Sequence, residues 1–210
     1  DSGFVGFMVT IPHKETILEL CDELDESSQL MGAANLLRFD GDKIIGYTTD
    51  GWAAVKSMRE EGVEVTGAKL AVLGGGGAAR TLALTFAREG AQKIFSLNRT
   101  VERAESIARE VRELGVEVET GTLEEDNLKS VLSGVDVLVN STSVGMSPKI
   151  ETSPVPASCL HKDMAVYDIV YNPMETRLLR EARAVGAVVQ DDDARRLRQD
   201  RTDERLDGEG

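Results

Sequence analysis

The sequence contains few histidines, cysteines and aromatic residues, and each of these shortages excludes a kind of site or core. Two histidines among 210 residues cannot form a histidine-rich metal site, and we expect no metal. The two cysteines, Cys21 and Cys159, have no CxxC partner, so we expect ordinary reduced thiols that are partly buried. Aromatic residues make up 4% of the chain and hydrophobic residues 41%, so the core must be mostly aliphatic.

Positive charge is scarce as well, and the formal net charge is −13. A surface this negative repels phosphate backbones and anionic lipids, so we expect neither nucleic acid nor a membrane as a partner. No apolar run approaches the roughly 20 residues that a membrane-spanning helix needs, and there is no signal peptide. We therefore expect a cytoplasmic protein, for which the acidic surplus would also suit high salt. The sequence does not decide the oligomeric state, which is either a monomer or a homodimer.

The chain begins with Asp rather than Met, in the middle of a strand-like pattern, so we interpret it as part of a longer reading frame. Residues 4–10 predict a short buried strand, and Pro12 is expected to begin a helix that continues to Leu24. Two further strands flank the turn DGD. A helix is predicted at 50–61. The segment GVEVTG after it marks a boundary, so residues 1–62 are expected to form a partial α/β lobe that binds substrate.

From Lys69 onward, predicted strands alternate with predicted helices. Apolar segments predict strands at 69–74, 93–98, 116–121, 135–142, 164–171 and 187–190. Amphipathic segments between them predict helices at 78–90, 100–115, 123–134 and 174–186. This alternation is typical of βαβ units, so we expect a Rossmann-like α/β domain with a doubly wound parallel sheet over residues 63–190.

Residues 191–210 break this pattern, because acids and arginines surround only three apolar residues. Such a segment has too little apolar surface to offset the entropy of ordering it, so we expect a disordered tail or a loosely attached helix. Its abrupt change of composition suggests a shifted reading frame. Sequencing the gene across the codons for residues 188–195 would test that hypothesis.

Four glycines separate the strand at 69–74 from the helix that follows, in the segment VLGGGGAAR. A flexible linker would have spacers on either side, whereas a dinucleotide-binding loop joins strand and helix directly. Gly74 would make the tight turn, Gly76 would let the backbone approach a pyrophosphate, and Ala79 would let helix and strand pack closely. The cofactor would contact the loop residues Gly74, Gly75, Gly76, Gly77 and Ala78, at a helix N-terminus that favours anions.

The second strand of this domain ends in SLNRTVER, with no acid at its tip to bind a ribose 2′-hydroxyl. Arginine pairs with phosphate in a fork geometry and also stacks on adenine. The residues Asn98, Arg99, Thr100 and Arg103 therefore suit the 2′-phosphate of NADP. The alternative is a pair of surface arginines on an amphipathic helix.

Two N-terminal segments are ordinary when taken alone. Lys14 stands beside a proline turn in VTIPHKE, and Asp50 precedes a helix in GYTTDGW, where it could act as an N-cap. Seven segments in order, however, resemble the shikimate dehydrogenase family over about residues 4–188. They are GFMVTIPHKE, GAAN, GYTTDG, VLGGGGAAR, NRTVERA, VNSTSVGM and YDIVYNPMETRLL.

The resemblance implies a reaction, the reversible reduction of 3-dehydroshikimate to shikimate by hydride transfer from NADPH, in aromatic amino-acid and chorismate biosynthesis. Lys14 would serve as the acid/base at the reacting oxygen, and Asp50 would hold that lysine and a substrate hydroxyl. Substrate would be the small-molecule partner, and no metal would be needed. The other matched positions are Thr10, Asn35 and Tyr171 for the substrate, Ile169 near the nicotinamide, and Thr142 and Ser143 at the carboxyl edge of the sheet.

The sequence also departs from the family pattern. Met8 and Thr48 stand where the family has asparagines, and a thioether bonds a substrate hydroxyl poorly. The family's N-terminal SxS motif and C-terminal glutamine segment are missing from these 210 residues. Two alternatives therefore stay open, a quinate/shikimate dehydrogenase and a catalytically impaired NADP-binding fragment.

Overall fold

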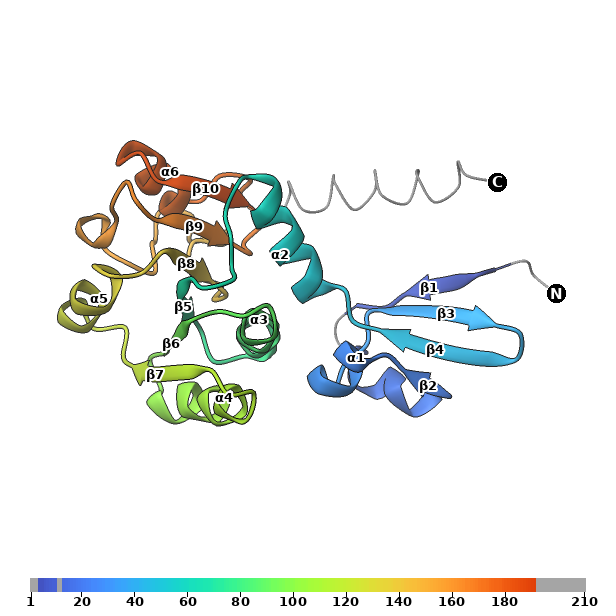
Figure 1. The fold of residues 1–210 in the computed structure, drawn as a ribbon. Helices are drawn as coiled ribbons and strands as arrows, with labels where there is room; N and C mark the ends of the chain where they lie inside the picture. Colours follow the sequence, from blue (N-terminus) through green and yellow to red (C-terminus); the bar gives the residue numbers. More distant parts are fainter. Residues whose placement is uncertain (1–3, 11–12, 192–210) are drawn as a thin grey trace. The chain divides into compact units, whose positions relative to one another are not determined.

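The computed structural model describes residues 4–10 and 13–191 (Figure 1). The chain divides into two compact units between Ala53 and Ala54, inside helix α2 (Asp50–Glu60). The boundary predicted from the sequence lies after this helix, at residue 62, and stays a prediction. The later turns of α2 belong to the second unit, where Ser57 is buried and accepts a hydrogen bond from Gln190. The predicted tail at 191–210 lies almost entirely outside the described residues.

The first unit is built on a four-stranded sheet in the order β1-β3-β4-β2, in which only the pair β2 and β4 is parallel. Its strands are β1 (Gly6–Met8), β2 (Glu23–Leu24), β3 (Leu36–Asp40) and β4 (Lys43–Tyr47). β3 and β4 form the predicted hairpin, with Gly41 at a φ of +61° in its turn. Helix α1 (Glu26–Met31), which the sequence pattern did not predict, begins at Asp25, whose side chain caps it by accepting the amide of Ser28.

The helix predicted from Pro12 to Leu24 is wrong in the part that the structure describes. Thr16–Leu20 form a short 3-10 helix, η1, and β2 follows it. Pairing with β4 overrides the helical pattern, because the amide of Asp22 donates to the carbonyl of Ile44 at 2.8 Å. A Cβ on Gly46 would lie 2.9 Å from Cys21 Sγ, so the missing side chain allows this segment to pack against β4.

The second unit contains the predicted parallel sheet, with six strands in the order β10-β9-β8-β5-β6-β7 (Figure 1). The strands are β5 (Lys69–Leu73), β6 (Lys93–Leu97), β7 (Glu117–Gly121), β8 (Val137–Asn140), β9 (Ala165–Asp168) and β10 (Val188–Asp191). All four residues of β8 are buried, as expected of a strand that is covered on both faces. The predicted Rossmann-like fold is confirmed.

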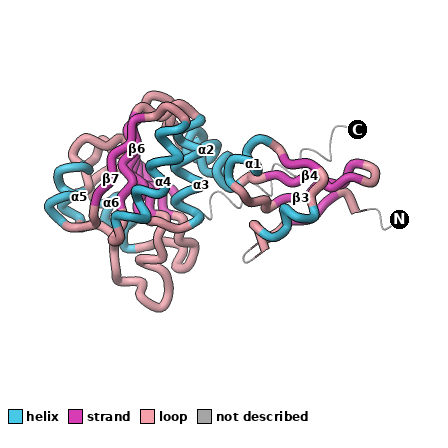
Figure 2. Tube along the Cα trace, turned by 90° about the horizontal axis from the view of Figure 1, so that it is seen from below, coloured by secondary structure: helices cyan, strands magenta, loops and turns pink. Residues whose placement is uncertain are grey.

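Helices cover both faces of this sheet, and Figure 2 shows α5 on one side and α3 and α4 on the other. The helices are α3 (Gly77–Arg88), α4 (Val101–Glu113), α5 (Glu125–Leu132), α6 (Arg177–Ala184) and the short 3-10 helix η2 (Ala157–Cys159). α5, η2 and α6 share one core with the sheet, in which Leu132, Leu138 and Leu178 are fully buried. Gly90 and Gly115 end their helices with φ near +80°, as predicted. None of the helices in the described residues is long and apolar enough to span a bilayer.

The strand order places a topological switch point at β5. The chain runs from β5 outward through β6 to β7, then returns to the other side of β5 and continues through β8 and β9 to β10. At such a point the connections after two neighbouring strands diverge, and ligands of open α/β sheets bind in the crevice outside the carboxyl ends. The glycine loop follows β5 directly, so the fold puts it at this position.

Candidate active site

Lys14 and Asp50 are in direct contact although 36 positions separate them in the chain. Lys14 Nζ lies 2.5 Å from Asp50 Oδ2, and both side chains are about one-third exposed. Asp50 is the first residue of α2, where the positive end of the helix dipole stabilises a carboxylate. The arrangement holds an ammonium group at a position that a small molecule in solvent can reach.

Asn35 holds the other side of this carboxylate. Its Nδ2 donates to Asp50 Oδ1 at 2.9 Å and to Thr49 Oγ1 at 3.0 Å, while its Oδ1 accepts the amide of Thr49 at 2.9 Å. Asn35 is 4% exposed. Both amide hydrogens of Asn35 are therefore used within the protein. The geometry lets Asn35 position Asp50, and its predicted contact with substrate stays a prediction.

The other predicted substrate residues are exposed. Thr10 is solvent-facing and accepts the amide of His13 through its carbonyl at 2.9 Å. Tyr171, in the second unit, is 49% exposed after β9. Of the two departures from the family pattern, Met8 is 69% exposed, whereas Thr48 is buried and donates its hydroxyl to the carbonyl of Ala33. Thr48 therefore has a structural role in the first unit.

The glycine loop is shaped by its neighbours at two of its four positions. Gly74 has a φ of +129°, and a Cβ there would lie 2.7 Å from Ser141 Oγ. A Cβ on Gly75 would lie 2.7 Å from both Asn98 Nδ2 and Arg103 Cβ. The tight turn predicted at Gly74 is therefore present.

The end of the loop, by contrast, is open. Gly76 and Gly77 would place a Cβ in free space, and Ala78 is exposed. Gly76 is the N-cap of α3 and carries no side chain to cap its first turn. No side-chain cap therefore occupies the amide groups of that turn, which an anion at a helix terminus would use. Ala79 is fully buried behind them, which agrees with its predicted packing role.

The residues predicted to bind a 2′-phosphate lie beside this loop, at the end of β6 and the start of α4. Asn98 donates through Nδ2 to the carbonyl of Thr100 at 2.9 Å, and Thr100 is the N-cap of α4. Arg99 and Arg103 are exposed, and within the described part of the chain no carboxylate lies within 4.0 Å of either guanidinium. Arg80, in contrast, is engaged by Glu110 at 2.6 Å. Two cations therefore remain available at the end of β6 and the start of α4, and Arg103 lies beside Gly75.

The loops after β8 and β9 carry the remaining predicted cofactor residues. The hydroxyl of Thr142 donates to Asn140 Oδ1 at 2.7 Å and accepts the amide of Val144 at 3.1 Å. Ser143 is exposed, and the amide of Ile169 donates to the carbonyl of Asn140 at 3.1 Å. Both loops are thus attached to Asn140, which sequence reasoning did not identify as a site residue.

Sequence reasoning also missed Ser141, Asp168 and Thr176. Ser141 Oγ donates to the carbonyl of Leu73 at 2.5 Å and so fixes the start of the glycine loop. Asp168 and Thr176 are fully buried and hydrogen-bonded to each other at 2.7 Å. The sequence contains a pattern that could have identified Ser141 and Asp168. Both are polar residues at the carboxyl end of an apolar parallel strand, and such residues lie at the ligand-binding edge of the sheet.

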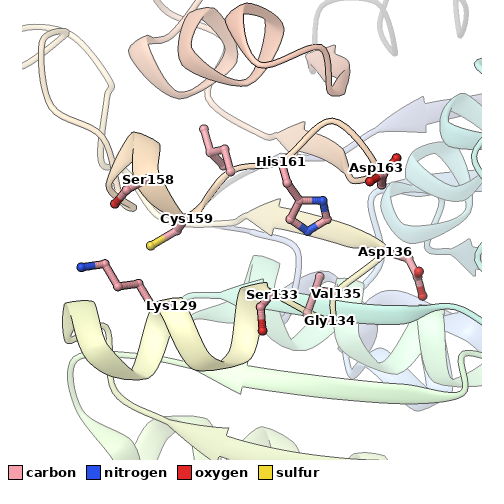
Figure 3. A pocket seen from close by; sticks show the side chains of 10 residues that line it. Lys129, Ser133, Gly134, Val135, Asp136, Ser158, Cys159, His161 and Asp163 are labelled. Carbon is pink, nitrogen blue, oxygen red and sulfur yellow. The ribbon is translucent and has the colours of Figure 1, made fainter.

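A further cavity of about 630 Å³ opens beside α5 and η2, and its lining includes Lys129, Cys159 and His161 (Figure 3). His161 Nε2 lies 3.1 Å from the carbonyl of Leu132. This cavity adjoins the residues that precede β8 and β9, at the amino edge of the sheet. The glycine loop is at the carboxyl edge, so the cavity does not belong to the candidate cofactor site.

Comparison with known proteins identifies the family. Residues 56–172 match the family model described as shikimate / quinate 5-dehydrogenase, and residues 1–37 match that of the shikimate dehydrogenase substrate binding domain. This chain belongs to the shikimate dehydrogenase family. The resemblance found in its motifs is thereby confirmed.

Individual relatives agree with this assignment. The NADP(+) shikimate dehydrogenase of Methanopyrus kandleri is 47% identical over 89% of this chain. A crystal structure of a shikimate dehydrogenase in complex with NADP⁺ is 42% identical with a TM-score of 0.79, covering 90% of this chain and 66% of that one. A quinate dehydrogenase from Corynebacterium glutamicum in complex with NAD is 31% identical with a TM-score of 0.79, covering 89% and 66%. The chain spans only 66% of the length of the M. kandleri relative.

Proposed function

We propose that this chain carries the acid/base pair and the cofactor site of an NADP-dependent shikimate dehydrogenase. The proposed reaction is the reversible reduction of 3-dehydroshikimate to shikimate. The contact between Lys14 and Asp50 is the observation that carries the proposal, since a reductase of ketones needs a proton donor at the carbonyl oxygen. The relatives that are named NADP(+) shikimate dehydrogenases support the choice of substrate.

Lys14 would donate a proton to the carbonyl oxygen of the substrate as negative charge develops there. Its ammonium group also stabilises that charge electrostatically before the proton moves. Asp50 orients the lysine through its Oδ2, while Asn35 fixes Asp50 from its other oxygen. In the reverse direction, Lys14 in its neutral form would accept the proton from the C3 hydroxyl of shikimate.

The residues around the glycine loop fit NADP. NADPH supplies the hydride when it is bound. The open space at Gly76 and Gly77 admits a pyrophosphate to the first turn of α3, and the buried Ala79 lets that helix approach the sheet. Arg99 and Arg103 are free to pair with a 2′-phosphate, for which an NAD site would instead offer a carboxylate.

Quinate is the second candidate substrate, because the matching family model covers both substrates and a quinate dehydrogenase is among the similar structures. That structure is a complex with NAD, whereas the unpaired arginines here favour NADP. Measuring oxidation of shikimate and of quinate with each cofactor separates the two reactions. NADPH binding without turnover of saturating shikimate would instead support the alternative of a catalytically impaired NADP-binding protein.

The decisive experiment compares NADP reduction by shikimate in the parent chain and in Lys14→Ala. We expect the substitution to lower kcat by roughly 10²- to 10⁴-fold, the usual contribution of a positioned acid/base. Lys162→Ala is the matched control, since Lys162 is exposed in the turn before β9. An unchanged rate in Lys14→Ala would exclude the proposed catalytic role of Lys14.

A further inference from the structure

A fully buried polar pair joins the ends of β8 and β9. Asn140 and Asp168 are register partners in these strands, and both are 0% exposed. Asn140 Nδ2 donates to Asp168 Oδ1 at 2.9 Å. A carboxylate and an amide at this depth would be costly to bury unless their hydrogen bonds served the structure around them.

Each member of the pair holds one of the two loops that follow. Asn140 Oδ1 accepts the amide and the hydroxyl of Thr142, at 3.1 and 2.7 Å. Asp168 Oδ1 accepts the amide of Val170 at 3.0 Å. The Asn140–Asp168 bond therefore joins the loop after β8 to the loop after β9, together with backbone bonds from Ile169 to Asn140 at 3.1 Å and from Ser147 to Asn172 at 2.9 Å.

A third connection reaches the helix that follows. Asp168 Oδ2 accepts the hydroxyl of Thr176 at 2.7 Å, and the same hydroxyl oxygen caps α6 by accepting the amide of Leu179 at 3.3 Å. Thr176 is also fully buried. The segment between Val170 and Thr176, which contains Tyr171, is thus held at both ends by one carboxylate.

The order of the strands indicates which half of a bound dinucleotide would contact the loops after β8 and β9. The glycine loop and the arginines follow β5 and β6, on one side of the switch point, whereas β8 and β9 lie on the other. A dinucleotide that crosses the switch point with its 2′-phosphate at Arg99 and Arg103 extends its other end toward the loops after β8 and β9. That end is the nicotinamide.

We infer that the Asn140–Asp168 pair is a positioning element for the nicotinamide half of the cofactor. It acts by holding the loops that contain Thr142 and Ile169, without touching the cofactor itself. The inference rests on the proposed NADP-dependent function. It predicts that damage to the pair impairs binding of the nicotinamide end and spares binding of the adenosine end.

The test compares two ligands, NADPH and adenosine 2′,5′-bisphosphate, which lacks the nicotinamide half. In Asn140→Asp, a carboxyl oxygen replaces the amide nitrogen and faces Asp168 Oδ1, so the two groups either repel each other or must take up a proton that the parent pair does not need. We expect at least fivefold weaker NADPH binding, measured by calorimetry, and a change of less than twofold for the bisphosphate. Equal losses for both ligands, or no loss for either, would overturn the inference.

A second pair of variants tests the inference if Asn140→Asp does not fold. Thr176→Val removes the hydroxyl but keeps the shape, and should weaken NADPH selectively, while Thr176→Ser keeps the hydroxyl and should restore binding. Asp136→Asn is the matched control, because Asp136 Oδ2 accepts the amide of Lys69 at 2.7 Å at the opposite edge of the same sheet. It should leave the ratio of the two affinities unchanged. If the parent chain binds neither NADPH nor the bisphosphate, the proposed function is wrong, and the inference, which rests on it, is wrong as well.

Discussion

The hydroxyl of Ser141 occupies the space that a side chain at Gly74 would need. A Cβ on Gly74 would lie 2.7 Å from Ser141 Oγ and 3.2 Å from its carbonyl oxygen. The backbone of Gly74 also has a φ of +129°, which residues with side chains rarely adopt. The start of the glycine loop is therefore constrained by the strand beside it as well as by its own turn.

Gly74→Ala should destabilise the second unit by about 1–3 kcal/mol, since it adds both a steric clash and backbone strain. Gly77→Ala is the matched control, because a Cβ there meets nothing within 4 Å. We expect Gly77→Ala to retain full stability yet bind NADPH more weakly, since the methyl group enters the space proposed for the pyrophosphate. Urea unfolding and NADPH titration measure the two effects separately. Equal stability of Gly74→Ala and the parent would contradict the structural constraint.

Removing the two arginines that follow β6 should change the preference between NADPH and NADH. The double variant Arg99→Ala/Arg103→Ala should lose at least tenfold in affinity for NADPH and little for NADH, because only NADPH carries the 2′-phosphate. The affinity of the parent for NADPH should also fall as salt is raised. Arg109→Ala, on the exposed face of α4, is the control and should preserve the preference. A double variant that loses both cofactors equally would place the phosphate elsewhere.

Asp25 should contribute stability that disappears in acid. Burial alone would raise the pKa of Asp25, but hydrogen bonds from the side chains and amides of Ser27 and Ser28 outweigh it and lower the pKa below 3.8. A carboxyl whose pKa is lower in the folded state stabilises the fold above its ordinary pKa. That contribution is lost as the pH falls from about 4 through the lowered value.

Two substitutions separate this charge from the cap itself. Asp25→Ala should cost about 0.5–2 kcal/mol at neutral pH through loss of the N-cap of α1. Asp25→Asn should retain most of the cap, yet lose stability less steeply than the parent below pH 4. Unfolding of the three proteins in urea between pH 3 and pH 7 provides the measurement. Parallel stability curves for the parent and Asp25→Asn would show that the carboxylate plays no part.

Cys159 should react slowly with alkylating reagents in the folded protein. Burial raises the pKa of its thiol above 9.0, although Ser158 and Lys129 partly oppose this, and only 6% of the residue is exposed. Iodoacetamide at pH 8 should therefore modify Cys159 much more slowly than it does in urea, with a rate that rises as the pH passes 9. Peptide mass spectrometry distinguishes it from Cys21, and Cys159→Ser identifies the signal. Equal rates with and without urea would contradict the burial.

Several site residues can be identified from the sequence because their chemistry is local. The glycine loop stands directly between a strand and a helix, and the arginines follow the next strand. Both patterns are defined by residues that are close together in the chain, so the sequence is sufficient to predict them. The pairing of Lys14 with Asp50 follows only from the resemblance to the family, since each residue by itself is typical of an ordinary surface or cap position.

Other features depend on neighbours that are distant in the chain. The helix predicted up to Leu24 gives way to η1 and β2 because Gly46 leaves room for Cys21 against β4. Asn35 directs both of its amide hydrogens at Thr49 and Asp50, which lie 14 and 15 positions further along the chain. Neither outcome can be derived from the periodicity of the segment concerned.

The sequence by itself determined the α/β fold, the alternation of strands and helices from β5 onward and the family, because periodicity, helix-ending glycines and short motifs are encoded locally. The tertiary structure alone decided which polar residues meet. Asn140 and Asp168 lie 28 positions apart at the ends of two apolar strands, and only the register of β8 against β9 brings them within 2.9 Å. Such contacts depend on how whole elements pack, and for that reason the residues that position the loops are found only in the folded chain.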